Sequence, residues 1–373
     1  MSMQHVFRTL LSCALVAGMA GAAEAQSKNQ TQNVRHLGRT TPLSGGAFTV
    51  DWPSSGFEAS FTGAMMTARI DDWGSNWLNV EVDGEMKTID LNEGADTYVL
   101  FSGPSGPHTI KVTRRTAPQV GPTTFLNIWA DGPIEATPAP ARRLLVIGDS
   151  IVTGFGVEGA DQSCRYSHAT QNADLAYPAL LARAFDADLQ SVSFDGAGLM
   201  RNYSGDGPAM NTLSWQRNYS RPALWPTAEW TPNAVVVNLG TSDFSAGDPG
   251  DDFDANYIGL IAKIRSTWPE AQIFATFGGL VGPQHAALKS SISSAVATVA
   301  GQVDRKVHVV ELTPPNRGRR YGCDWHPGIG AQQAMADQFQ GIFEATLGWS
   351  AAPASPGKQA SLQAAPKSLP SLR

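Results

Sequence analysis

The chain has little cysteine and few histidines, and its interior carries no long apolar run. Three of its 373 residues are cysteine and seven are histidine. Beyond the N-terminal region no apolar stretch approaches the length of a membrane-spanning helix, so the sequence predicts no span. The formal net charge is −6, with both signs scattered along the chain. This distribution argues against a nucleic-acid partner and leaves neutral partners such as glycans open.

The two ends of the chain are predicted to lie outside the folded part. Arg8 precedes an apolar stretch at 10–17, and small residues follow at 23–25. This is the order of a secretory signal peptide. We therefore expect residues 1–25 to be removed and the mature protein to be secreted or periplasmic. The segment 351–373, rich in Ala, Pro, Ser and Lys, is expected to be disordered.

Loss of the signal peptide would remove Cys13 and leave Cys164 and Cys323. In an oxidising compartment such a pair most naturally forms one disulfide, and two buried thiols are the alternative. The two cysteines have neither a Cys-x-x-Cys spacing nor a histidine pairing, so they do not indicate a metal site. We expect no metal and no cofactor.

Two hydrophobic periods predict two domains. From residue 34 to 137, short runs alternate apolar and polar residues between Gly, Pro, Asp and Asn, which is typical of an antiparallel β-sandwich. Asp83-Gly84 between two such runs is a hairpin signal. From residue 141 to 350, continuous aliphatic strands alternate with helical stretches. This pattern indicates an α/β domain with a central parallel sheet covered on both faces.

Ser150 is the candidate nucleophile. It follows the aliphatic run 144–147 in the order Gly148-Asp149-Ser150. That triplet alone is ordinary turn chemistry. A serine directly after a buried strand and at a helix start, however, stands beside backbone N–H groups that can bind an oxyanion. Ligands of parallel sheets also bind at the carboxyl ends of the strands.

His326 is the candidate base, because a serine nucleophile needs a neighbouring proton acceptor. It stands in a glycine-rich loop before a helix, after Asp324 and before Pro327, and such loops often carry function. Asp324 is the candidate to orient the imidazole. Since it stands only two residues away, a backbone carbonyl in that role is the alternative.

Two further strand ends offer oxyanion donors. Gly196, in "SFDGAGL", would let a backbone N–H approach closely, and Ser242, in "NLGTSDF", would offer a hydroxyl. Ordinary glycine-rich turns are the alternative for both. Asp149, Trp215 and Trp325 are candidate substrate contacts, the indoles because sugar rings stack on them; packing is the alternative for each tryptophan.

Four blocks taken together resemble those of the SGNH (GDSL-type) hydrolases. The blocks are Gly148-Asp149-Ser150, Gly196, Gly240-Thr241-Ser242-Asp243 and Asp324-Trp325-His326-Pro327. The preceding sandwich makes the chain similar to carbohydrate esterase family 2, in which a jelly-roll domain precedes an SGNH domain. The resemblance covers about residues 34–347.

The resemblance implies an exported carboxylic ester hydrolase that removes acetyl groups from polysaccharides such as xylan and glucomannan, without a metal. It implies Ser150 as nucleophile, His326 as base, and the amides of Ser150 and Gly196 as oxyanion donors. Some members of the family orient the histidine with a main-chain carbonyl. The chain departs from the family at Ser242, where an asparagine is usual and reaches farther than a hydroxyl.

Two other functions stay open at this point. One is a carbohydrate-binding protein that has lost catalysis, and the other is an esterase for a lipid, a thioester or an acetylated wall sugar. We expect a monomer that acts on an acetylated polysaccharide or oligosaccharide.

Overall fold

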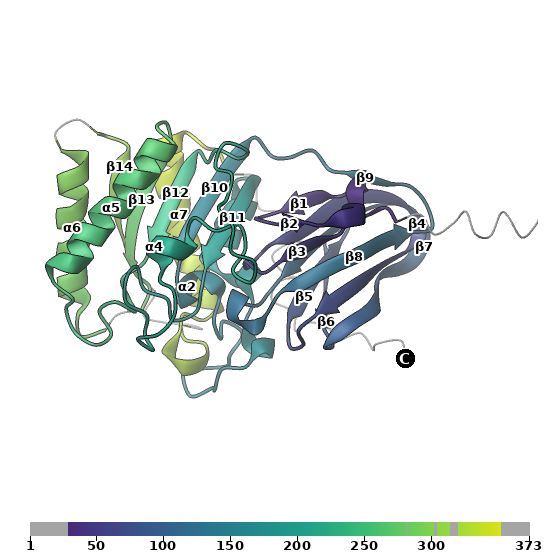
Figure 1. Cartoon of the computed structure of the whole chain (residues 1–373), viewed down its shortest axis with the longest axis horizontal. Helices are drawn as coiled ribbons and strands as arrows, with labels where there is room; N and C mark the ends of the chain where they lie inside the picture. Colours follow the sequence, from purple (N-terminus) through teal and green to yellow (C-terminus); the bar gives the residue numbers. More distant parts are fainter. Residues whose placement is uncertain (1–28, 281, 302–303, 314–319, 352–373) are drawn as a thin grey trace, which may run out of the picture.

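The computed structural model of the protein describes residues 29–280, 282–301, 304–313 and 320–351. Antiparallel strands occupy its purple and blue part, and parallel strands its teal and green part (Figure 1). This confirms the predicted order of an antiparallel β domain followed by an α/β domain. The expected signal peptide 1–25 and residues 352–373 of the expected tail lie outside the described residues. Within the described ranges, no helix is both long and apolar enough for a membrane span.

The antiparallel sheet of the described chain has nine strands: β1 (Arg35–Leu37), β2 (Thr41–Pro42), β3 (Phe48–Val50), β4 (Gly56–Asp72), β5 (Trp77–Val82), β6 (Glu85–Asp90), β7 (Gly94–Arg114), β8 (Thr123–Ala130) and β9 (Ile134–Ala136). Their order is β2-β3-β8-β4-β7-β5-β6, with β1 and β9 also paired to β4. Short 3-10 turns accompany them: η2 (Thr31–Asn33), η3 (Ser44–Gly46) and η4 (Pro118–Val120).

Alternation along the strands builds the core of this sheet. On β4, Phe57, Ala59 and Phe61 are buried, and they share one apolar cluster with Val112 of β7 and Phe125 of β8. Successive side chains of a strand point to opposite faces, so one face supplies the core.

The turn between β5 and β6 follows the predicted hairpin signal. Asp83 and Gly84 have φ angles of 52° and 89°, the left-handed conformation that a two-residue Asp-Gly turn requires.

The parallel sheet follows β9 in the chain. Its strands are β10 (Arg142–Gly148), β11 (Ala187–Ser193), β12 (Ala234–Asn238), β13 (Gln272–Gly278) and β14 (Val307–Leu312), in the order β11-β10-β12-β13-β14. The helices are α2 (Ser150–Thr153), α3 (Tyr177–Ala184), α4 (Met210–Leu213), α5 (Asp251–Thr267), α6 (His285–Ala300) and α7 (Ile329–Leu347), with the turns η5 (His168–Thr170), η6 (Ala173–Leu175) and η7 (Cys323–Trp325).

Helices cover both faces of the parallel sheet. Leu145 and Ile147 of β10 join one apolar cluster with α5 and α6, whereas Leu144 and Val146 join another with α3 and α7. The continuous apolar strands predicted this two-sided burial. Because the strands run parallel, their carboxyl ends meet at one edge of the sheet, and the loops that follow them gather there.

Buried arginines of the antiparallel part bind the α/β part. Arg39, 1% exposed, donates from Nε to Gln190 Oε1 (3.0 Å) and from Nη1 to the carbonyl of Ser214 (2.8 Å). Arg115, also 1% exposed, donates from Nε to the carbonyl of Gln171 (3.1 Å). A buried guanidinium without hydrogen-bond partners would cost free energy. Because the acceptors of Arg39 and Arg115 named here belong to the α/β part, separation of the two parts would leave these arginines without them.

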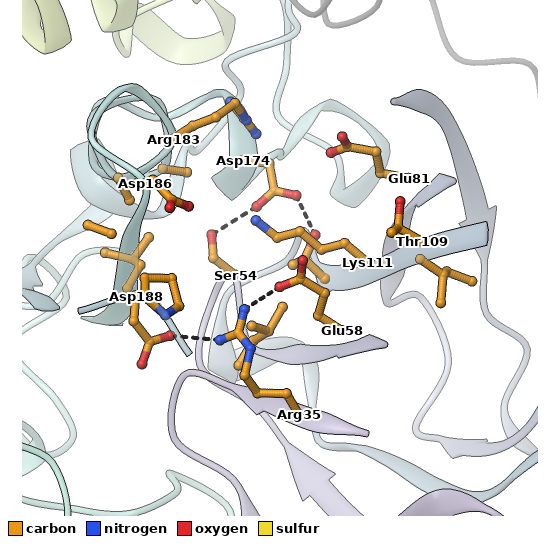
Figure 2. A pocket seen from close by; sticks show the side chains of 18 of the residues that line it. Arg35, Ser54, Glu58, Glu81, Thr109, Lys111, Asp174, Arg183, Asp186 and Asp188 are labelled. Carbon is orange, nitrogen blue, oxygen red and sulfur yellow. Dashed lines mark hydrogen bonds and ion pairs between the residues drawn. The ribbon is translucent and has the colours of Figure 1, made fainter. Parts of the chain in front are cut away.

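A polar cavity of 460 Å³ lies in the same interface (Figure 2). On its wall Arg35 pairs with Glu58 and, at 3.2 Å, with Asp188, which joins β1 to β4 and β11. Asp174 accepts a hydrogen bond from Ser54 Oγ (3.1 Å). These charged groups therefore hold the two parts of the chain together.

Candidate active site

Ser150 stands at the start of α2, directly after β10. The carboxylate of Asp149 caps the helix by accepting from the N–H of Ile151 (2.9 Å). A Cβ atom at Gly148 would lie 2.2 Å from Val152 Cγ2, so glycine is what allows this tight turn from strand to helix. The turn brings Ser150 to the carboxyl edge of the sheet.

His326 lies beside this serine. Its Nε2 is 2.8 Å from Ser150 Oγ, and its Nδ1 is 3.1 Å from the carbonyl oxygen of Asp324. A carbonyl oxygen only accepts, so Nδ1 carries the proton and Nε2 accepts from the serine hydroxyl. Burial lowers the pKa of His326 below its ordinary value, against a smaller raising effect of the Asp324 carbonyl. The imidazole is therefore neutral at pH 7.

The carboxylate of Asp324 does not face the histidine. It accepts a hydrogen bond from the N–H of Tyr166 (2.9 Å). Asp324 and Trp325 have φ angles of 48° and 66°, a left-handed turn that brings the carbonyl of residue 324 to Nδ1 of His326. Of the two orienting groups left open above, the structure therefore places the backbone carbonyl, and not the side chain, against the imidazole.

A disulfide joins Cys164 to Cys323, as the cysteine pair predicted. Backbone hydrogen bonds support it on both sides: the N–H of Asp324 donates to the carbonyl of Cys164 (2.9 Å), and the N–H of Cys323 donates to that of Gly156 (2.9 Å). The loop that carries His326 is thereby tied to the segment that follows α2.

Two aromatic residues without a predicted role form a stack that packs against His326. The rings of Phe155 and His326 lie 4.3 Å apart, and those of Phe155 and Tyr166 lie 3.9 Å apart at 12°. The hydroxyl of Tyr166 donates to Gln171 Oε1 (2.8 Å). Their only sequence signal is closeness to Ser150 and Cys164 in the chain.

Asp243, the last residue of the third block, organises the loop that follows β11. Its carboxylate accepts three backbone hydrogen bonds, from Leu199 (2.7 Å), Met200 (2.9 Å) and Arg201 (2.9 Å). In the same loop Gly196 has φ 71°, a conformation that favours glycine. Sequence alone placed Asp243 in the third block without a role.

A cavity of 610 Å³ opens beside Ser150. The predicted site residues Gly196, Ser242, Asp324 and His326 line it. Its other walls are formed by the residues Phe155, Tyr203, Thr241, Phe244, Ser245, Gly247, Leu280, Gly282, Pro283, Gln284, His285 and Leu288. Polar groups thus gather at the serine, while much of the wall between the loops after β12 and β13 is apolar.

None of the three predicted substrate contacts is among the residues that line this cavity. Asp149 is fully buried, because its side chain caps α2, and burial raises its pKa to about 7. Trp215 is 7% exposed and stacks on Trp268 at 5.8 Å, so it is a packing residue. Trp325, 58% exposed, stays at the surface next to His326.

Metal-ligating side chains do not gather at the serine. Across the part of the chain that the structure describes, no three of the side chains His, Cys, Asp and Glu are grouped so that they could hold a metal ion.

Two family models match the chain, one over each of its two domains. The family model described as GDSL-like Lipase/Acylhydrolase family matches residues 146–334, and the model described as Carbohydrate esterase 2 N-terminal matches residues 36–140. The chain therefore belongs to the GDSL-like lipase/acylhydrolase family and carries the N-terminal domain of carbohydrate esterase family 2. It is a carboxylic ester hydrolase of the carbohydrate esterase type.

Individual relatives cover most of the chain. It is 31% identical to the cellulase/esterase CelE of Acetivibrio thermocellus over 306 residues, which are 80% of this chain and 38% of CelE. It is 26% identical to an acetylxylan esterase / glucomannan deacetylase of Cellvibrio japonicus over 347 residues, 87% of this chain and 94% of that protein. A family two carbohydrate esterase from Clostridium thermocellum, solved in complex with cellohexaose, superposes with a TM-score of 0.81 at 29% identity, covering 85% and 99% of the two chains.

Proposed function

We propose that the protein is an exported serine esterase that removes O-acetyl groups from polysaccharides. The observation that carries this proposal is the 2.8 Å contact between Ser150 Oγ and His326 Nε2, with Nδ1 held by the Asp324 carbonyl, at the wall of a cavity. A hydroxyl bonded to a neutral imidazole is the arrangement of an activated nucleophile.

The reaction needs two displacements. Ser150 Oγ forms a bond to the ester carbonyl carbon while its proton passes to His326 Nε2. The bond between that carbon and the sugar oxygen then breaks, and the sugar oxygen takes the proton from His326. Water next attacks the acetyl carbon of the acetyl-enzyme while one of its protons passes to His326 Nε2. The bond between that carbon and Ser150 Oγ then breaks, Oγ takes the proton from His326, and acetic acid, which ionises to acetate, leaves with Ser150 and His326 restored.

The negative charge on the carbonyl oxygen in each tetrahedral intermediate needs donors. We assign the N–H groups of Ser150 and Gly196 and the hydroxyl of Ser242 to this role, since all three residues line the cavity. Removal of one such donor typically costs ~10²–10³ in rate. We expect Ser242 to be the weakest donor of the three. The family usually has an asparagine at this position, and the hydroxyl of Ser242 reaches less far toward the oxyanion than an asparagine amide would.

The relatives support an acetylated glycan as substrate. Two proteins of Cellvibrio japonicus similar to this chain are named acetylxylan esterase / glucomannan deacetylase. Trp325, 58% exposed beside the base, and Tyr203, 75% exposed at the cavity, offer flat faces on which sugar rings stack. The predicted signal peptide supports export.

One observation favours a second substrate class. Phe244, Leu280 and Leu288 give the cavity an apolar wall, and a methyl group alone would leave much of 610 Å³ unfilled. An ester with a longer acyl chain would bury more apolar surface there, at roughly 25 cal/mol per Å².

The deciding experiment measures acetate release from acetylated glucomannan and acetylated xylan by the wild type and by Ser150→Ala. We expect release that disappears in the variant. Retention of full activity by Ser150→Ala would refute the serine mechanism, and binding of both polymers without turnover by the wild type would favour a protein that has lost catalysis. A series of p-nitrophenyl acetate, butyrate and octanoate ranks the acyl groups: a kcat/KM that rises with chain length would favour the second class.

A further inference from the structure

The mechanism above leaves without a role a partly buried carboxylate that contacts the last residue of α2. Asp195 directly precedes Gly196, so the two share the peptide bond whose N–H is the assigned oxyanion donor. Its carboxylate accepts hydrogen bonds from Thr153 Oγ1 and from Gln171 Nε2, the latter at 3.1 Å to each oxygen.

The contact with Thr153 connects Asp195 to Ser150, whose N–H is the other assigned backbone oxyanion donor. Thr153 is the last residue of α2, which begins at Ser150, and its hydroxyl is also 3.1 Å from the carbonyl of Ser150. A hydroxyl has one proton, so it donates to Asp195 or to this carbonyl at a given moment. Asp195 is therefore the side-chain link between the backbone of Gly196 and the helix whose first N–H belongs to Ser150.

The Gln171 contact connects Asp195 to the antiparallel part of the chain. Gln171 is fully buried, and its Oε1 accepts from the N–H of Ala117 (3.1 Å). Gln119, in η4 of the same segment, also hydrogen-bonds the Asp195 carboxylate. The side-chain amide of Gln171 thus has partners from the antiparallel domain, from Asp195 and from the aromatic stack behind the base through Tyr166.

We propose that Asp195 is a positioning residue that fixes the separation of the two backbone oxyanion donors, and that Gln171 and the segment 117–119 of the antiparallel domain hold it in place. On this proposal the N-terminal domain has a part in catalysis without touching substrate. The inference rests on the proposed serine esterase function.

Asp195→Asn is the sharpest test, because it keeps the volume and turns one acceptor oxygen into a donor facing the Gln171 amide. Displacement of a catalytic group by about 1 Å can cost on the order of 10²-fold in rate. We expect kcat for p-nitrophenyl acetate to fall at least tenfold, with KM within twofold. The affinity for a boronic acid, which adds to Ser150 and places an oxygen at the oxyanion donors, should fall in parallel.

Thr153→Val removes the other end of the link without changing the side-chain shape, and it decides the question if Asp195→Asn does not fold. The double variant should be no slower than the worse single variant, since both remove one contact. Asp51→Asn is the matched control: Asp51 is a buried aspartate whose carboxylate accepts from Ser220 N and Oγ, both at 2.8 Å, and its kcat should stay within twofold of wild type.

Wild-type kcat in Asp195→Asn and Thr153→Val, or an equal fall in Asp51→Asn, would overturn the positioning role. If either of these outcomes is seen while Ser150→Ala is inactive, only the positioning role is refuted, and the proposed esterase function is retained. Full turnover by Ser150→Ala would refute the proposed function itself.

Discussion

Replacement of the Cys164–Cys323 disulfide by two serines should lower both stability and turnover. The bridge closes a sequence separation of 159 residues. For a loop of this length the chain-entropy model gives roughly 5 kcal/mol, and measured effects are often smaller. In a chain of this size 1 kcal/mol corresponds to about 2 °C or somewhat less, so we expect Tm to fall by about 5–10 °C.

The effect on turnover follows from the backbone near the base. Asp324 and Trp325 hold positive φ angles of 48° and 66° next to the bridge. A left-handed conformation costs roughly 1–2 kcal/mol per residue other than glycine. Without the bridge this loop can relax and move His326 away from Ser150. About 1.4 kcal/mol corresponds to tenfold in rate. Release of the strain of one of the two residues, at the upper end of this range, would therefore lower kcat by about ten- to thirtyfold, and this is the fall that we expect.

Calorimetry and initial rates with p-nitrophenyl acetate measure the two effects on the same preparations. The wild type after reduction should behave like Cys164→Ser/Cys323→Ser, and reoxidation should restore it, which the double variant cannot do. A lower Tm with wild-type kcat would show that the bridge stabilises the fold without positioning His326. An unchanged Tm would contradict the loop-closure reasoning.

Four further outcomes are expected. Asp324→Asn should keep kcat within about threefold, whereas loss of a triad carboxylate costs about 10⁴; a loss of that size would restore a role to the carboxylate. Because the base works only when neutral and the pKa of His326 is lowered from 6.5, the acid limb of the kcat/KM profile should have its midpoint below pH 6.5, and a midpoint above 7 would contradict this. Ser242→Asn should raise kcat by up to about tenfold, since it adds donor reach, and steady-state kinetics would show a fall if the wall cannot accept the amide. Burial raises the pKa values of Asp149 and Asp195 to about 7, so the folded state binds protons more tightly than the unfolded state and the free energy of unfolding falls as pH rises from about 4 to about 7; Tm by calorimetry should be higher at pH 5.5 than at pH 8, and the reverse order would refute it.

The parts of the fold that depend on local pattern could be predicted from sequence. The change from alternating to continuous apolar strands separated the two sheets, and strand ends placed Ser150 and Gly196 at one edge. His326 was found because its loop precedes a helix and few other histidines were candidates. Each of these inferences uses only neighbours in the chain and the rule that parallel strands share an edge.

Side-chain direction could not be predicted in the same way. Asp149 and Trp215 stand in segments that lead to the site, yet one caps α2 and the other is buried against Trp268. Asp195 and Gln171 act through contacts with residues distant in the chain, and no periodic pattern marks them. The carbonyl that faces His326 depends on positive φ angles at residues other than glycine, which sequence patterns rarely reveal.

A carbonyl at Nδ1 in place of a carboxylate has consequences for the base. A carbonyl dipole stabilises the imidazolium less than a full negative charge would, so it opposes the effect of burial only weakly and the pKa of His326 stays low. The base is then available in mildly acidic solution, but the cation that forms in the transition state is stabilised less. Precise orientation of Ser150 and His326 must make up for this weaker stabilisation of the cation, because no carboxylate faces Nδ1 of His326. The disulfide, the Phe155 ring and the Asp195 link all restrain backbone or ring positions around Ser150, which is where rigidity would compensate for the missing charge.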